Sequence, residues 1–346
     1  MKVLLYEQGK KTLKKSGIGR ALQHQKKALE LQGIEVTFNI HDQYDFVHIN
    51  STFKKSAKFM HSLQARGIPV LVHGHSTEED FRYSFRAWQR IEPWFDRNLK
   101  RIYSSADIIV TPTPYSKKLI ENYSYVHCPV RALSNGIDLE KYAPDAQAVQ
   151  AYLDYFQLKP QQKVIIGIGL PFERKGLIDF IDVAKKMPDI IFIWFGHLAR
   201  FATHPKILRA IAQKPTNVIF PGYISGAVIR GALQRADAML FPSYEETEGI
   251  VVLEALASRL PLIVRDIPVY EDWLQEGTNC FKGANNEDFI RIIYSIYEED
   301  LSEMVNAGYQ VAAARSLDIV GKGLLAIYQE TIAITEQKKQ KQTINR

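Results

Sequence analysis

Two glutamates in the C-terminal half have a spacing that suits binding of a polyhydroxylated ligand. Glu246 and Glu254 are separated by seven residues, with Gly249 and an apolar run between them, in the segment YEETEGIVVLEALA. We expect Glu246 at the end of a strand and Glu254 inside an apolar helix that begins near Gly249. A buried carboxylate must accept hydrogen bonds, and a pair of sugar hydroxyls is one suitable donor. A salt bridge of Glu254 on a partly exposed helix is the alternative.

The start of the same predicted helix offers a second kind of contact. Its first backbone N–H groups have no partner within the helix, and the helix dipole adds a partial positive charge there. Such a helix start binds diphosphate groups well. The amides in question lie around Gly249 to Val251. Together with the two carboxylates, they predict a pocket for a nucleotide sugar.

A basic pair lies at another predicted helix start, in the segment GLPFERKG from residue 169 to residue 176. The helix dipole disfavours positive charge at this position unless an anion is bound. Arg174 and Lys175 are therefore candidates for binding a phosphate. A solvated helix terminus is the alternative.

The segment SGIGRALQHQ follows the first predicted strand and opens a helix, as a phosphate-binding loop does. A simple turn and helix start is the alternative. Leu22 stands where the dinucleotide fingerprint has its third glycine, which argues against an NAD-dependent dehydrogenase.

Two further polar candidates, His73 and His75, follow a later strand in VLVHGHSTEEDF. For His73 we also consider a structural role at the strand end.

Short apolar runs alternate with helix-length segments along both halves of the chain, a pattern typical of parallel βαβ units. The length of 346 residues favours two domains. We therefore predict an α/β fold with two doubly wound, Rossmann-like domains, joined by a polar linker over residues 144–162, and with ligands at the carboxyl ends of the strands. The predicted segments are residues 1–145 for the first domain, 160–315 for the second, 316–335 for a helix that returns to the first domain, and 336–346 for a mobile polar tail.

Aromatic and basic residues alternate between residues 81 and 101, within a helix predicted over residues 80–104. On one helix, three aromatic residues would share a face and three arginines would form a stripe roughly 130° away. Pro93 should break or kink the helix. The pattern fits a contact with an anionic membrane surface, although inward packing and binding of single-stranded nucleic acid are alternatives. The residues concerned are Phe81, Arg82, Phe85, Arg86, Trp88 and Arg90.

The composition excludes several other classes of protein. Hydrophobic residues make up 46% and charged residues 24% of the chain, which is typical of a globular protein. No apolar run approaches the roughly 20 residues that span a bilayer, and no signal peptide is evident, so we expect a cytoplasmic protein. The two cysteines, Cys128 and Cys280, lack neighbouring ligands at metal-binding spacing.

Four segments in order resemble signatures of the retaining GT-B glycosyltransferases of family four. They are SNGIDLEKY, GLPFERKG, RADAMLFPS and the E-x7-E segment. The resemblance implies that Glu246 contacts the donor hexose, Glu254 the ribose, and the 247–251 amides the diphosphate. It makes Lys175 and Arg174 the phosphate-binding cations, although Leu170 occupies the usual arginine position. It also implies that the glycine loop faces the donor phosphates and the acceptor, which makes Gly17, Gly19 and Arg20 candidate binding residues. His75, more than His73, would hydrogen-bond the donor sugar.

Within that family, the chain looks like the bacterial second-step glycolipid synthases, which add an α-hexose to α-monoglucosyl-diacylglycerol and make the lipid anchor of lipoteichoic acid. The resemblance implies a UDP-hexose donor, either UDP-galactose or UDP-glucose, with a lean to galactose. It implies a peripheral position on the inner face of the cell membrane, no nucleic acid partner, no cofactor and no obligatory metal. His75, Glu246 and Lys175 would carry catalysis. A soluble or polyprenyl-linked glycan acceptor, as in cell-wall or capsular polysaccharide synthesis, is the alternative.

Overall fold

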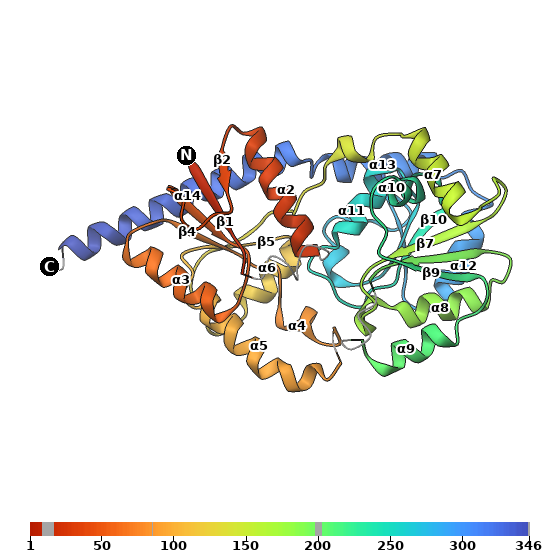
Figure 1. Ribbon diagram of the computed structural model, residues 1–346, viewed down its shortest axis with the longest axis horizontal. Coiled ribbons are helices and arrows are strands. Elements are labelled where there is room, and N and C mark those ends of the chain that lie inside the picture. Colours follow the sequence, from red (N-terminus) through yellow and green to blue (C-terminus); the bar gives the residue numbers. More distant parts are fainter. Residues whose placement is uncertain (9–16, 85, 198–202, 345–346) are drawn as a thin grey trace. The chain divides into compact units, whose positions relative to one another are not determined.

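The computed structural model describes residues 1–8, 17–84, 86–197 and 203–344 (Figure 1). The chain divides into two compact units. The first consists of Met1–Glu78, Gln89–Gly136 and Arg315–Arg346, and the second of Glu79–Trp88 and Ile137–Ala314. Each unit is built on one six-stranded parallel sheet.

The first unit has a sheet in the order β2-β1-β3-β4-β5-β6. Its apolar strands are buried on both sides, as expected for a parallel sheet that helices cover on both faces. α3, α5 and α6 pack on one face, and α2 and the last helix pack on the other. The elements are β1 (Lys2–Tyr6), α2 (Gly17–Leu31), β2 (Glu35–Thr37), β3 (Phe46–Ile49), α3 (Lys54–Ala65), β4 (Val70–His73), α4 (Glu78–Phe81), α5 (Trp88–Tyr103), β5 (Ile109–Thr111), α6 (Pro114–Glu121), β6 (Val130–Ala132) and α14 (Leu317–Ile344).

The second unit has a sheet in the order β12-β11-β10-β7-β8-β9. α8, α9 and α12 cover one of its faces and bury a continuous core that includes Trp194 and Phe180. The elements are η1 (Leu139–Tyr142), α7 (Ala146–Phe156), β7 (Val164–Ile168), η2 (Glu173–Lys175), α8 (Leu177–Lys185), β8 (Ile191–Phe195), α9 (Pro205–Ala212), β9 (Val218–Gly222), α10 (Ala227–Arg235), β10 (Ala238–Phe241), α11 (Ile250–Ala257), β11 (Leu262–Arg265), η3 (Pro268–Tyr270), β12 (Phe281–Gly283), α12 (Asn286–Ser295) and α13 (Ser302–Ala313).

The order of strands reverses once in each sheet. In the second unit the chain runs outward from β7 through β8 and β9, and then returns to pair β10 with β7 on the other side. Loops that leave the carboxyl ends of two such strands diverge and leave room for a ligand. The segments that follow β7 and β10 are GLPFERKG and YEETEG, so the fold positions the predicted binding residues at this switch point.

The single helix predicted over residues 80–104 is wrong. α4 ends at Phe81 and α5 begins at Trp88. Tyr83 and Ala87 between them have φ of 58° and 54°, values that an α-helix of L-residues cannot include. α5 then continues through Pro93 instead of ending there.

The aromatic face and the arginine stripe predicted on that helix therefore do not exist as one surface. Phe81 is buried, Trp88 is half-buried, and Phe85 lies outside the described residues. Arg82, Arg86 and Arg90 are exposed, but they do not lie on one helix.

Two further expectations need correction. The polar segment 144–162 contains helix α7, whose start is capped by the Asp145 carboxylate accepting a hydrogen bond from the Ala148 N–H at 2.9 Å. The C-terminal helix α14 extends through the predicted tail as far as Ile344. It lies in the first unit, where Tyr328 stacks on Phe46 and Arg131 pairs with Glu330.

Candidate functional site

The turn after β7 approaches the end of β10 closely in the second unit. Gly176 has φ of 69°, and a Cβ atom there would lie 2.2 Å from the carbonyl oxygen of Pro242. Only glycine allows this approach. The contact brings Lys175, just before Gly176, next to Glu246, just beyond Pro242.

Glu246 and Lys175 form a buried ion pair at this point. The Lys175 ammonium group donates to Glu246 Oε1, and the Ser243 hydroxyl donates to the same oxygen at 2.6 Å. The Arg174 guanidinium lies 3.6 Å from this carboxylate oxygen. The carboxylate is therefore held by two cations and one hydroxyl.

The two partners of this pair titrate differently. Burial raises the pKa of Glu246, but Lys175, Arg174 and Ser243 outweigh it, so its pKa lies below the ordinary value. Burial lowers the pKa of Lys175, and Glu246 opposes that shift without cancelling it. Glu246 is thus a stable acceptor of hydrogen bonds from a ligand at neutral pH.

Arg174 is held in place by the short segment that joins α4 to α5. Its Nε donates to the Ser84 hydroxyl at 2.7 Å, and its NH1 group donates to the Glu245 carbonyl oxygen at 2.8 Å. No motif in the sequence indicates this role for Ser84. The structure therefore brings the predicted second cation, Arg174, to the predicted carboxylate, Glu246.

The predicted start of α11 is confirmed, with Gly249 directly before the helix at φ of 85°. Thr247 and Glu248 precede it, and Ile250 and Val251 form its first turn, where backbone N–H groups lack partners within the helix. Glu254 lies one turn further and is only 3% exposed, as predicted for a carboxylate inside an apolar helix. The roles of these residues toward a nucleotide sugar stay predictions.

The first unit holds a cluster of buried imidazoles. The rings of His73 and His75 stack with centroids 3.9 Å apart, and His48 Nε2 lies 3.1 Å from His73 Nδ1. The Tyr328 hydroxyl of α14 lies 2.8 Å from His48 Nδ1. Burial lowers the pKa of His48 and of His75 to about 3, and places the pKa of His73 well below its ordinary value. All three rings are therefore neutral at physiological pH.

Hydrogen bonds fix the orientation of these rings. The Gln25 side-chain amide donates to Asn50 Oδ1 at 2.9 Å and lies 3.0 Å from His73 Nδ1. Asn50 Oδ1 is also 2.7 Å from His75 Nε2, and an amide oxygen only accepts, so this nitrogen of His75 carries the proton. Sequence reasoning missed Gln25, His48 and Asn50. In the first sheet the order of strands reverses between β1 and β3. Gln25 lies on α2, which follows β1, His48 lies on β3, and Asn50 directly follows β3, so all three come from elements beside this switch point.

Three other predicted residues lie at the start of α2 in the first unit. Gly17 is the first helical residue and is exposed, and Gly19 and Arg20 are half-buried in the first turn. A helix therefore opens at Gly17, as predicted.

Among the described residues, no group of three or more His, Cys, Asp or Glu side chains is arranged to hold a metal ion.

Comparisons with known proteins bear directly on these two units. Residues 153–311 match the family described as "Glycosyl transferases group 1", and residues 38–141 match "Glycosyltransferase Family 4". The processive diacylglycerol alpha-glucosyltransferase of Acholeplasma laidlawii is 52% identical over 96% of this chain and 99% of its own length. The chain belongs to glycosyltransferase family 4. The predicted family and the predicted enzyme class are therefore confirmed.

More distant relatives of this family 4 glycosyltransferase include another glycolipid enzyme. The alpha-galactosylglucosyldiacylglycerol synthase of Streptococcus pneumoniae (strain ATCC BAA-255 / R6) is 28% identical over 66% of this chain and 59% of its own length. Together with the Acholeplasma enzyme, it shows that this family 4 glycosyltransferase is related to glycolipid synthases.

Solved structures resemble the fold at much lower identity. Sucrose-phosphate synthase from Thermosynechococcus elongatus has a TM-score of 0.81 at 14% identity, covering 96% of this chain and 99% of its own. Anabaena Alr3699/HepE in complex with UDP-glucose has a TM-score of 0.73 at 16% identity, covering 95% and 100%. They confirm the predicted GT-B fold for this family 4 glycosyltransferase.

Proposed function

We propose that this glycosyltransferase moves an α-glucosyl residue from UDP-glucose to α-monoglucosyl-diacylglycerol and forms a diglucosyl lipid. The relative from Acholeplasma laidlawii, which is named a processive diacylglycerol alpha-glucosyltransferase and aligns over almost its whole length, supports the lipid acceptor. That name also favours glucose over galactose, to which the family resemblance gave a slight lean. The single observation that carries the proposal for this chain is the buried Lys175–Glu246 pair at the β7/β10 switch point.

The residues of the second unit suit a donor that carries both hydroxyls and a diphosphate. Glu246 accepts hydrogen bonds from hydroxyls of the hexose, and Glu254 accepts from the ribose. Lys175 and Arg174 supply positive charge to the diphosphate, and the first amides of α11 add further donors. Tight binding of the leaving diphosphate stabilises the charge that develops on it in the transition state.

Transfer then needs no carboxylate nucleophile. In the proposed same-face displacement, the acceptor hydroxyl oxygen forms the new bond to the anomeric carbon while the bond to the diphosphate oxygen breaks. The acceptor proton passes to the departing diphosphate. In this mechanism, the neutral ring of His75 hydrogen-bonds the donor sugar, and its contact with Asn50 holds it in place. The reaction as proposed requires no metal or other cofactor.

A basic surface of the first unit supports action at an anionic membrane. On α5, the exposed residues include Trp94, which is 51% exposed, and Ile91. The Trp94 ring contacts Phe53 at the start of α3, with centroids 6.2 Å apart. The exposed basic residues of the same two helices are Arg90, Arg97, Lys100 and Arg101 on α5 and Lys54, Lys55 and Lys58 on α3. We call this set the α3/α5 surface.

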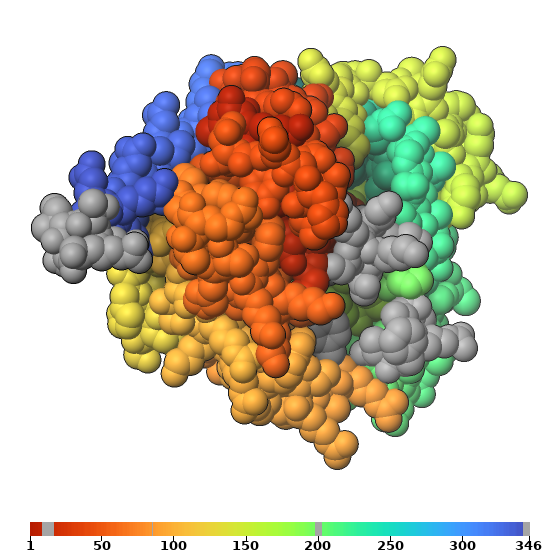
Figure 2. Space-filling model, turned by 60° about the vertical axis from the view of Figure 1, so that its left-hand side comes forward, coloured from red at the N-terminus to blue at the C-terminus, as the bar shows by residue number. Residues whose placement is uncertain are grey.

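The α3/α5 surface combines what an interfacial protein needs. Its aromatic and aliphatic groups can enter the headgroup region, while its positive charges attract anionic lipids at about 1 kcal/mol for each basic residue. In Figure 2, the orange atoms of this part of the chain reach the surface over a broad area. No helix among the described residues is long and apolar enough to cross a bilayer.

One assay tests the proposed reaction. UDP-glucose and UDP-galactose are incubated separately with the enzyme and vesicles of α-monoglucosyl-diacylglycerol, with and without an anionic lipid, and the lipids are separated by chromatography. We expect a diglucosyl lipid from UDP-glucose, formed faster on anionic vesicles. Absence of lipid product from both donors, with transfer to a soluble or polyprenyl-linked glycan instead, would contradict the proposed acceptor.

A further inference from the structure

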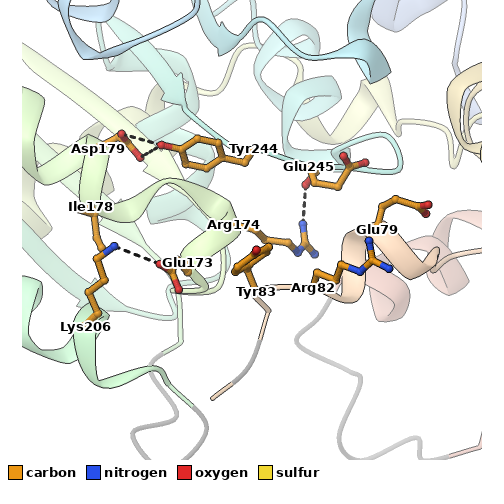
Figure 3. A pocket seen from close by; sticks show the side chains of 10 residues that line it. All are labelled: Glu79, Arg82, Tyr83, Glu173, Arg174, Ile178, Asp179, Lys206, Tyr244 and Glu245. Atoms are coloured by element: carbon orange, nitrogen blue, oxygen red, sulfur yellow. Dashed lines mark hydrogen bonds and ion pairs between the residues drawn. The ribbon is translucent and has the colours of Figure 1, made fainter. Parts of the chain in front are cut away.

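A cavity lies within the second unit, next to Arg174 and so beside the Lys175–Glu246 pair. Its volume is about 580 Å3, which falls in the range of small-molecule binding sites, roughly 300–1,000 Å3. Neither Lys175 nor Glu246 lines it. Figure 3 shows the residues that do, which are Glu79, Arg82, Tyr83, Glu173, Arg174, Ile178, Asp179, Lys206, Tyr244 and Glu245.

Two tyrosines of this cavity are exposed but held in defined positions. Tyr83 is 53% exposed, has φ of 58°, and accepts a backbone hydrogen bond from the Arg174 N–H at 3.4 Å. Tyr244 is 50% exposed, and its hydroxyl lies 3.1 Å from both carboxylate oxygens of Asp179 (Figure 3). The Arg265 guanidinium covers the Tyr244 ring at 3.9 Å. A bulky residue at positive φ marks a backbone conformation that the surroundings enforce.

The charges that line the cavity argue against an anionic ligand. Its four carboxylates outnumber its three cationic side chains. One of those cations, Lys206, is already paired with Glu173 at 3.3 Å, and Arg174 donates to Ser84 and Glu245. Carboxylates and tyrosine hydroxyls instead suit a neutral ligand with several hydroxyl groups.

Fixed aromatic rings next to such acceptors suit a sugar in particular. A hexose has one face of C–H groups, which an aromatic ring can cover, and a rim of hydroxyls, which carboxylates can bind. Ligand sites commonly combine apolar or aromatic walls with a few placed polar groups. Tyr83 and Tyr244 provide the rings, and Asp179 and Glu173 provide carboxylates.

The cavity and the predicted donor site share a wall. Arg174 lines the cavity and also lies 3.6 Å from the Glu246 carboxylate. Tyr244 and Glu245 directly precede Glu246, and the Tyr244 N–H donates to the Arg174 carbonyl oxygen at 2.7 Å. A sugar in the cavity would therefore lie close to a hexose that Glu246 holds.

We propose that this cavity binds the glucosyl headgroup of the acceptor lipid, with Tyr83 and Tyr244 as its specificity-determining residues. This inference rests on the proposed function, because it names the part of that acceptor that the cavity recognises. It assigns a role to the segment between α4 and α5 other than membrane contact, since Arg82 and Tyr83 line the cavity.

Kinetics of Tyr83→Ala and Tyr244→Ala test the proposal. The acceptor KM for α-monoglucosyl-diacylglycerol should rise about tenfold in each variant, which corresponds to roughly 1.4 kcal/mol of lost binding. The KM for UDP-glucose should not change. Tyr294→Ala is the matched control, because Tyr294 is 53% exposed on α12 of the same unit and does not line the cavity.

Binding of octyl α-glucoside in the presence of UDP, measured by saturation-transfer NMR, separates this proposal from the proposed function. The wild-type protein and Tyr294→Ala should bind the glucoside, and Tyr83→Ala and Tyr244→Ala should bind it much more weakly. If wild-type enzyme makes no glycolipid but shows this pattern, the sugar site stands and the proposed reaction fails. If both tyrosine variants bind the glucoside and the acceptor lipid like wild type, the sugar site is overturned even if wild-type enzyme makes the diglucosyl lipid.

Discussion

The Lys175 ammonium group donates a hydrogen bond to the Glu246 carboxylate, and both side chains are buried. Each charge therefore satisfies the other. A UDP-hexose offers separate partners to both, because its hydroxyls can donate to the carboxylate and its diphosphate can accept from the ammonium group. A free sugar or a free phosphate would satisfy only one of the two charges. The pair thus favours a ligand that carries both kinds of group.

Breaking this pair from one side should cost stability. Lys175→Ala leaves Glu246 buried with only Ser243 and the more distant Arg174, and removal of one partner of a buried ion pair costs about 3–5 kcal/mol. The double variant Lys175→Ala/Glu246→Ala should lose less unfolding free energy than the two single variants lose in sum. Urea denaturation of the four proteins measures this coupling.

A surface pair provides the control for that cycle. Lys185 lies 2.7 Å from Asp182 on the exposed side of α8, and such pairs contribute only about 0–1 kcal/mol. Lys185→Ala should therefore leave the unfolding free energy almost unchanged. If the double variant lost as much unfolding free energy as Lys175→Ala and Glu246→Ala lose together, that result would contradict a direct coupling of the two side chains.

Gly249→Ala should weaken donor binding. Its φ of 85° costs a residue with a Cβ about 1–2 kcal/mol, and the Cβ would lie 3.3 Å from Val252 Cγ2 in the first turn of α11. We expect a shift of the amides there and a rise of about tenfold in the KM for UDP-glucose.

Gly277→Ala is the matched variant, since Gly277 has φ of 71° but a Cβ atom added there would have no neighbouring atom within 4 Å. It should lose similar stability and keep its donor KM. Equal donor KM values for the Gly249 and Gly277 variants would show that α11 does not bind the diphosphate.

Stability should fall at mildly acidic pH because of the buried imidazoles. The pKa of His48 is about 3 in the folded protein, and that of His73 is also far below the value of about 6.5 that both have when unfolded. Below pH 6.5, the unfolded chain therefore binds protons that the folded chain does not. His48 should reduce the unfolding free energy by about 1.4 kcal/mol for each pH unit between roughly 6 and 4, and His73 should reduce it further in the same direction.

Urea midpoints at pH 7.5 and pH 5.5 check this pH dependence. The midpoint of the wild-type protein should be lower at pH 5.5, and His48→Gln should reduce the difference. His61 is an exposed histidine on α3, so His61→Gln should keep the wild-type difference. A His48→Gln variant with the full wild-type difference would contradict the assignment to this cluster.

Removal of charge from the α3/α5 surface should weaken membrane binding and leave UDP binding intact. Arg97, Lys100 and Arg101 together should contribute about 3 kcal/mol of attraction to anionic vesicles at low salt. Vesicle sedimentation of the triple serine variant, with Lys185, Lys186 and Arg291 replaced in a control of equal charge, measures the effect. Equal binding of both triple variants would rule out this surface as the contact.

Much of the fold follows from local patterns in the sequence. Apolar runs such as KVLLY and IIFIWFG predict β1 and β8 because parallel strands are buried on both faces. The short segments VRA and FKG do not predict β6 and β12, because each has a basic residue at its centre and so offers no continuous apolar run. The helix over 80–104 was wrong because helical periodicity does not reveal the left-handed conformations of Tyr83 and Ala87.

The candidate site was partly predictable for the same reason. Glu246, Lys175 and Gly249 follow strands or open helices in recognisable motifs, and the switch point brings Glu246 and Lys175 together. Ser84 and Tyr83 reach the site through tertiary contacts that no local spacing encodes. The imidazole cluster depends in the same way on α14, which is remote in sequence from His48.

Transfer of labelled glucose from UDP-glucose to α-monoglucosyl-diacylglycerol vesicles, by wild-type enzyme and by Glu246→Gln and Lys175→Ala, is the most direct measurement. Wild-type enzyme should form the diglucosyl lipid, and each variant should lose activity by at least about a hundredfold, the order of effect of one transition-state contact. Lys185→Ala should keep full activity. Wild-type turnover in both site variants, or no labelled lipid from wild-type enzyme, would contradict the proposed reaction at the Lys175–Glu246 pair.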